Sequence, residues 1–165
     1  MKSLIASICI LGLVGMMVGV GVQGAETAGV SATVTPKLLA VSVTDGSIDY
    51  GILDLNTSQD TVTLVDTQTV ANGSNVNVAL NIMSSDATGG TPWELAAAAG
   101  SDAFKHEFKG GDAGIWTQLP VDHSYATLDA SPADSSVAFD LQITTPTATT
   151  DSVQKTIAVT VQVTE

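Results

Sequence analysis

Cysteine, arginine and aromatic residues are scarce in this chain of 165 residues. Its single cysteine, Cys9, lies near the N-terminus, so no disulfide framework can hold the remaining residues together. Arginine is absent, which removes the side chain that clamps phosphates and carboxylates with two parallel hydrogen bonds. There are three phenylalanines, two tyrosines and two tryptophans. These shortages exclude a cysteine-stapled scaffold and make a folded domain depend on aliphatic packing.

Positive charge is also sparse, and its scarcity excludes one class of partner. Beyond residue 24, four lysines oppose all 17 acidic residues, which leaves a formal charge of −13. Nucleic acids and anionic lipid surfaces are bound through a basic footprint, which this chain lacks. The acidic surface keeps the protein in solution through self-repulsion, or it reflects adaptation to salt or assembly that depends on divalent cations.

The N-terminus has the three parts of a secretory signal peptide. Lys2 supplies the positive charge, an apolar run extends from Leu4 to Val22, and small residues follow at Gly24 and Ala25. We expect residues 1–24 to form a signal helix that is cleaved after Gly24, or one residue later. The apolar run of about 19 residues exceeds the usual ~7–15 of a signal peptide and approaches the ~20 of a membrane span. Retention as an uncleaved anchor is therefore the alternative, and it would be the protein's one contact with the membrane.

Residues 25–165 carry the alternation of apolar and polar side chains that is typical of half-buried strands. Threonine and valine, which suit a pleated surface, dominate this part of the chain. The clearest alternations are at 39–43, 76–82, 137–143 and 157–164. Weaker strands are expected at 30–35, 48–53, 61–65, 93–97, 104–108, 115–119 and 125–128. We predict one all-β domain, an antiparallel β-sandwich of Ig-like or jelly-roll type.

Turn residues separate these segments every 8–15 positions or so. Asn72-Gly73 is typical of a tight turn and predicts a hairpin between residues 67–71 and 75–83. One short helix is an alternative to a strand at 94–99, where four alanines occur. Trp93 and Trp116 are expected in the core between two sheets, and a platform for a sugar ring is the less favoured interpretation.

The residues that enzymes and metal sites need occur without a recognisable pattern. His106 and His123 are the only histidines. Neighbours on a strand point to opposite faces, so His106 and Glu107 could not share a metal, and His106 is expected to be a surface or cross-strand residue and not a ligand. Nucleophile elbows, phosphate loops and zinc motifs are missing from the sequence. Aspartates cluster near turns, which fits turn capping as well as calcium. We therefore assign no catalytic residue, metal ligand or cofactor.

Two glycosylation sequons fall in expected turns, at Asn56 and Asn72. Their use depends on the cell that makes the protein.

The segment Val70-Ala71-Asn72-Gly73-Ser74 is followed by alternating Val76, Val78, Leu80 and Ile82. With the export signal, the Thr-rich strands and the lack of cysteine beyond it, this middle third of the chain resembles exported prokaryotic Ig-like surface proteins of the camelysin and biofilm-fibre-subunit type. The resemblance implies polymerisation by strand exchange, in which one subunit donates a strand to a sheet of the next.

These observations lead to two hypotheses of function. The first is a secreted or cell-surface structural protein without enzymatic activity, which associates with itself or with another surface component. Its residues 26–35 would be the donated strand and its C-terminal strand the acceptor edge, and the alternative is that both terminal strands pair within one monomer. The second is an extracellular module that binds a glycan or a protein near Trp93, Trp116 or Tyr125. A secreted hydrolase has the least support.

Overall fold

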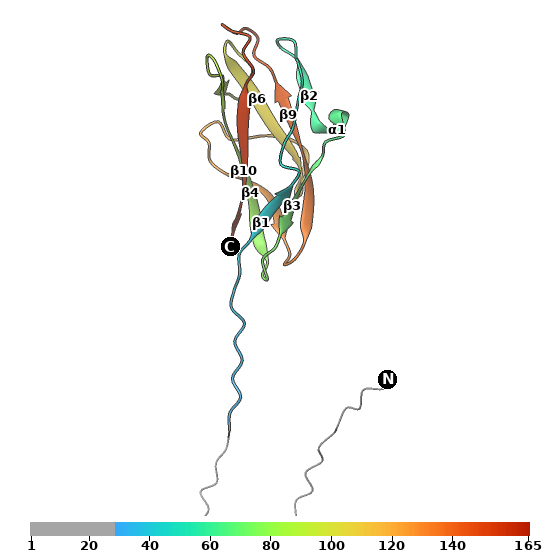
Figure 1. Cartoon of the computed structure of the whole chain (residues 1–165), viewed down its shortest axis with the longest axis vertical. Coiled ribbons are helices and arrows are strands. Elements are labelled where there is room, and N and C mark those ends of the chain that lie inside the picture. Colours follow the sequence, from blue (N-terminus) through green and yellow to red (C-terminus); the bar gives the residue numbers. More distant parts are fainter. Residues whose placement is uncertain (1–28) are drawn as a thin grey trace, which may run out of the picture. The chain divides into compact units, whose positions relative to one another are not determined.

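Nearly all regular structure in residues 29–165, the part of the chain described by the computed structural model, is β-strand. All of it lies within one unit, Thr35–Glu165 (Figure 1). The one helix of this part of the chain, α1 (Thr61–Leu64), is a single turn. The strands are β1 (Val41–Thr44), β2 (Ser58–Asp60), β3 (Gln68–Asn72), β4 (Val78–Thr88), β5 (Glu94–Leu95), β6 (Ala103–Gly110), β7 (Ala113–Gln118), β8 (Ala126–Ser131), β9 (Ser136–Thr144) and β10 (Thr156–Thr164).

These strands form two antiparallel sheets that pack against each other. The larger sheet has the order β1-β3-β9-β6-β5, with β2 also paired to β9 and β7 to β6. The smaller sheet has the order β10-β4-β8. Only the short β5 runs parallel to its neighbour. The prediction of a mostly β domain with antiparallel sheets is thus confirmed. The expected signal helix and the junction between Gly24 and Ala25 lie outside the described residues.

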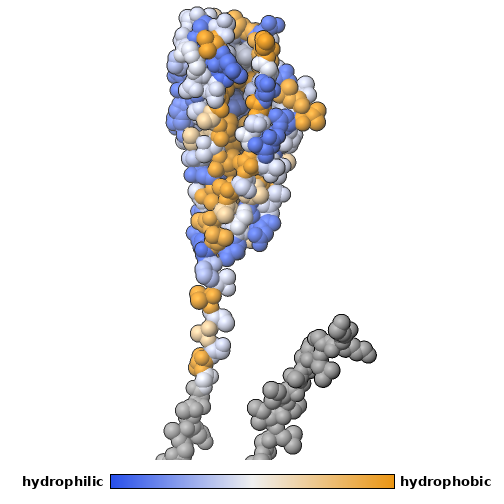
Figure 2. Space-filling view, in the orientation of Figure 1, coloured by the Kyte–Doolittle hydropathy of each residue, from blue (hydrophilic) through white to orange (hydrophobic). Residues whose placement is uncertain are grey.

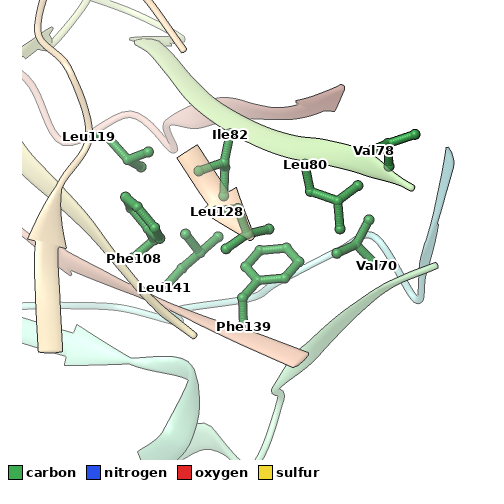
Figure 3. Close-up of a cluster of buried hydrophobic side chains, with 9 residues drawn as sticks. All are labelled: Val70, Val78, Leu80, Ile82, Phe108, Leu119, Leu128, Phe139 and Leu141. Atoms are coloured by element: carbon green, nitrogen blue, oxygen red, sulfur yellow. The ribbon is translucent and has the colours of Figure 1, made fainter. Parts of the chain in front are cut away.

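The core lies between the sheets and is made by the alternating residues. Figure 3 shows side chains from both sheets pointing toward one another, among them Leu80 and Ile82 of β4 and Phe139 and Leu141 of β9. Burying a side chain of this size stabilises the fold by about 1.5–3 kcal/mol. A second cluster contains Ala87, Leu95, Phe104 and Ile143. The strong alternations at 76–82, 137–143 and 157–164 therefore correctly predicted the inward and outward faces of β4, β9 and β10.

The strand expected at 61–65 is wrong in type, whereas the strand expected at 93–97 is confirmed over the alternative helix. Residues 61–65 form α1 because the Asp60 carboxylate accepts a hydrogen bond from the Thr63 N–H at 2.7 Å and caps a helical turn. That bond also holds the pKa of Asp60 below its usual range. Residues 94–99 form no helix. Instead β5 pairs with β6, and the buried Leu95 joins the second cluster.

The predicted hairpin at Asn72-Gly73 is also wrong. β3 pairs with β1 and β9, whereas β4 pairs with β10 and β8, so the chain crosses here from one sheet to the other. The Asn72 side chain is buried, and its Nδ2 donates to the carbonyl oxygen of Pro132 at 2.6 Å. Gly73 does not adopt a positive φ. The dipeptide fixes a crossing between sheets and does not close a tight turn.

Two expected strands have no counterpart in the structure. Residues 30–35 are not assigned to a strand, and neither are residues 48–53. In the second segment Gly51 has a φ of 71°, and its N–H is held by the Asp49 carboxylate at 2.8 Å. This local turn breaks the extended conformation.

The tryptophans are not the centre of the core. Trp93 and Trp116 are both half-buried, whereas Phe104 and Phe108 are the largest fully buried side chains. Each indole lies beneath a lysine ammonium, with Lys155 Nζ 5.4 Å from the Trp93 ring and Lys109 Nζ 5.9 Å from the Trp116 ring.

Candidate binding groove at the β10 edge

Strand β10 forms one edge of the smaller sheet. Within residues 29–165 it pairs with β4 alone, so one side of its backbone has no hydrogen-bonded strand, although β1 approaches it without pairing. Its inward residues, Ile157, Val159 and Val161, stay half-buried although they face the space between the sheets. An edge with free backbone groups and partly uncovered apolar side chains is a template for another strand. The C-terminal strand, expected to offer an exposed edge, is therefore an edge strand of the smaller sheet.

A groove of about 1190 Å³ opens beside this edge and reaches between the sheets. One wall consists of the inward side chains of β10, and the other of Phe139, Leu141 and Ile143 on β9. Figure 2 shows apolar side chains gathered in a strip along this face of the domain. The groove is larger than most small-molecule pockets, which span about 300–1,000 Å³.

The connection between β1 and β2 forms the rim of the groove. Ile48, Tyr50 and Leu53 line it, and Ile52, on the same rim, has a fully exposed side chain. Gly46 anchors this connection, because its N–H donates to Gln68 Oε1 at 3.0 Å and its φ of 69° suits glycine. The rim is therefore made of irregular backbone held at a few points, next to two rigid sheets.

His106 lies on the inner wall of the groove. It is 1% exposed, so the expectation of a surface position is wrong. Its Nδ1 lies 2.8 Å from Ser84 Oγ on β4, across the space between the sheets, and its Nε2 has no hydrogen-bond partner among the described residues. Burial disfavours the imidazolium and lowers the pKa of His106 to about 4, so the ring is neutral at neutral pH.

Tyr50 presents a second unpartnered polar atom. Its hydroxyl is buried and makes no hydrogen bond within the described part of the chain. Burial, together with the nearby carboxylates of Asp66 and Asp60, raises the pKa of Tyr50 well above its ordinary value. The phenol therefore stays protonated, and it is a potential donor at the rim of an apolar groove.

A lysine closes one end of the groove. Lys155, 6% exposed, donates from Nζ to the carbonyl oxygens of Gly89 and Thr91, each at 2.6 Å, and to Asp151 Oδ1 at 2.7 Å. The ammonium holds the pKa of the Asp151 carboxyl well below its usual range. The backbones of Gly89 and Gln154 lie close together here, since a Cβ on Gly89 would come within 2.3 Å of the Gln154 carbonyl oxygen. Lys155 is thus a structural clamp whose hydrogen-bond donors are in use.

The Ser84–His106 pair superficially resembles a catalytic dyad, but its geometry differs from one. Ser84 is fully buried between the sheets. Among residues 29–165, no carboxylate bonds to the other ring nitrogen to orient the histidine. No cluster of three or more His, Cys, Asp or Glu side chains with metal-binding geometry occurs in this range either. No helix of the described chain has the length and apolarity needed to cross a membrane.

The two predicted glycosylation sites differ in solvent exposure. Asn56 is exposed, with a φ of 55°, just before β2. Asn72 is 1% exposed, and its Oδ1 accepts from the Ser74 N–H at 2.9 Å. In the folded domain, only Asn56 of the two presents its amide to a glycosylating enzyme. Glycosylation itself stays a prediction.

The residues that matter most here were missed or misplaced from sequence, although one signal was present. His106 stands between Phe104 and Phe108 at a spacing of two, which places all three on one face of a strand. Tyr50 and Ser84 carried no comparable signal, because neither lies in a chemical motif. Comparisons of the chain with protein-family models, with curated proteins and with solved structures found no match.

Proposed function

We propose that this chain is a secreted or cell-surface structural protein without enzymatic activity, whose copies assemble by strand exchange. Residues 26–35 of one copy would add to the free edge of β10 of the next copy and cover the groove. The observation that carries this proposal is the unpaired edge of β10 beside an open apolar groove. Added strands gain affinity from backbone hydrogen bonds and specificity from alternate side chains.

The donor segment has the pattern that such an edge requires. Val30, Ala32 and Val34 alternate with Ser31 and Thr33, so an extended conformation would place the three apolar side chains on one face. Val30 and Val34 are exposed, and no strand is assigned to residues 29–40. Pro36 follows directly, and because proline has no N–H to donate to a ladder, it limits the strand on that side.

The strand connections support a β-sandwich of jelly-roll type over the Ig-like alternative. In an Ig constant-type domain, strands D and E follow each other within one sheet, as do F and G. Here β7, β8, β9 and β10 alternate between the larger and the smaller sheet. The export to a cell surface rests on the residues before 29, which have the composition of a signal peptide.

The test uses the secreted full chain and a pair of matched variants. Replacing Val30 and Val34 together by Asp places charge on the apolar face of the donor segment and should abolish assembly. Replacing Ser31 and Thr33 by Asp adds the same charge to the opposite face and should leave assembly largely intact. Light scattering and electron microscopy of negatively stained samples provide the measurements.

A synthetic peptide with the sequence of residues 28–36 gives an independent arm. It should occupy the β10 edge and cap growth, whereas a scrambled peptide of the same composition should not. Because each copy carries a charge of about −13 beyond residue 24, assembly should increase with ionic strength. Monodisperse monomers of the wild-type chain at high salt, with and without calcium, would refute strand exchange. Equal effects of the two Asp pairs would also refute it.

A further inference from the structure

We infer that the inner part of the groove binds an uncharged, elongated apolar molecule with a hydroxyl-bearing head group, of the monoacylglycerol class. The observation behind this inference is a pair of unpartnered polar atoms, His106 Nε2 and Tyr50 Oη, in a groove whose inner walls are mostly apolar. The site does not require assembly, so the inference goes beyond the proposed function.

The two polar atoms call for a ligand that can form hydrogen bonds. A buried polar group that lacks a partner destabilises a fold, and such groups are rare. Both residues line the same groove, and they come from separate parts of the chain, one on β6 and the other on the rim. Two such groups that line one groove indicate a recognition site more than a packing defect.

A donated strand would not satisfy these atoms. Its backbone would bond to β10, and the side chains that it would direct inward, Val30, Ala32 and Val34, have no polar atoms. His106 lies on the opposite sheet, on the inner wall. The polar atoms therefore point to an occupant other than the strand.

The walls near the polar atoms suit an alkyl chain. Leu53, Trp93, Ile143 and Ile157 surround this part of the groove and belong to the second core cluster or pack against it. The volume of about 1190 Å³ leaves room for a chain of many methylenes, whose removal from water favours binding.

The charges select an uncharged head group over a carboxylate or phosphate. The imidazole of His106 is neutral, and Lys155, a cation at the end of the groove, already donates to three oxygen atoms. The carboxylates of Asp60 and Asp66 lie near the Tyr50 hydroxyl and would repel an anion. A glycerol hydroxyl can donate to one of the two unpartnered atoms and accept from the other.

Tryptophan quenching offers a direct test, because Trp93 lines the groove and Trp116 does not. The test protein is the full chain with two sets of changes. Trp116→Phe leaves Trp93 as the single fluorescent reporter, and replacement of Val30 and Val34 by Asp keeps the protein monomeric. The probe is a monoacylglycerol with bromine in its acyl chain, titrated below its micelle concentration. We expect saturable quenching at one probe per chain.

Two pairs of variants then assign the binding to the polar atoms. Tyr50→Phe and His106→Leu should each raise the dissociation constant roughly three- to tenfold, which corresponds to the loss of one net hydrogen bond. The matched changes Tyr125→Phe and His123→Leu, at partly exposed residues outside the groove, should have no such effect. The fatty acid with the same brominated chain should bind less tightly than the glyceride.

The inference is overturned by unsaturable quenching, by equal effects of the matched variants, or by tighter binding of the fatty acid. Because the protein in this experiment is held monomeric, its outcome is separate from that of the assembly test. Absence of filaments in the wild-type chain with binding retained would refute the proposed function alone, and wild-type filaments without probe binding would refute this inference alone.

Discussion

Lowering the pH should destabilise this domain through one residue, His106. The unfolded chain has a histidine pKa near 6.5, whereas burial lowers the pKa of His106 in the folded state to about 4. Between these two values the unfolded state binds more protons than the folded state. The contribution of the neutral His106 to the free energy of unfolding is therefore fully present above pH 6.5 and is lost as the pH falls toward 4. Over a range of about 2.5 pH units the loss would reach roughly 3 kcal/mol.

The comparison of pH 7.5 with pH 5.0 isolates this effect, since carboxylates with ordinary pKa values titrate little in that window. From the same linkage, the free energy of unfolding should fall by about 2 kcal/mol between the two pH values. Urea denaturation followed by circular dichroism measures it. That loss is a substantial part of a typical domain stability of about 5–15 kcal/mol.

His106→Leu should remove most of this pH dependence, because the protonatable group is gone. The only other histidine, His123, provides the control, since its side chain is partly exposed and His123→Gln leaves the buried imidazole in place. An unchanged slope in His106→Leu, or its disappearance in His123→Gln, would show that the reasoning about burial is wrong.

Three further changes test the packing of the groove and the core. Tyr50→Phe should raise the free energy of unfolding by about 1 kcal/mol in urea denaturation without ligand, because it removes a buried hydroxyl that has no partner; a loss of stability would contradict this. Lys155→Met should lower that free energy by roughly 2 kcal/mol, because two carbonyl oxygens lose a charged donor, and an unchanged midpoint would argue against the clamp. Leu80→Ala should lower the free energy of unfolding by about 2–5 kcal/mol. The control Ile115→Ala, at a side chain that is 77% exposed, should change it by no more than about 0.5 kcal/mol. Equal effects of the two changes would show that Leu80 is not in the core.

The strands that could be predicted from sequence are those in which the alternation is long and one face is buried. In β4, β9 and β10 the period of two persists for at least seven residues, which a helix could not accommodate. The same period puts His106 on one face of β6 with Phe104 and Phe108, a signal that the expectation of a surface position did not use. Local sequence therefore contained both the fold class and one residue of the groove.

The rest depended on contacts that local sequence does not encode. Residues 61–65 read as a strand by composition, but one hydrogen bond from the Asp60 side chain selects a helical turn. Asn72-Gly73 reads as a hairpin, but the asparagine is held by carbonyl groups about 60 positions later in the chain. Likewise, the Tyr50 hydroxyl lacks a hydrogen-bond partner because of where the connection between β1 and β2 packs against the two sheets, which the local sequence does not encode.

The position of β10 in the fold has a consequence for how the domain folds. β10 supplies the last strand of the described chain, yet its partner β4 lies near the middle, and Asn81 Nδ2 bonds Thr164 Oγ1 across 83 positions. The smaller sheet cannot be completed until residues 156–164 are available to β4. Pairing at such separation makes folding slow, because loop-closure entropy is lost before the contacts form.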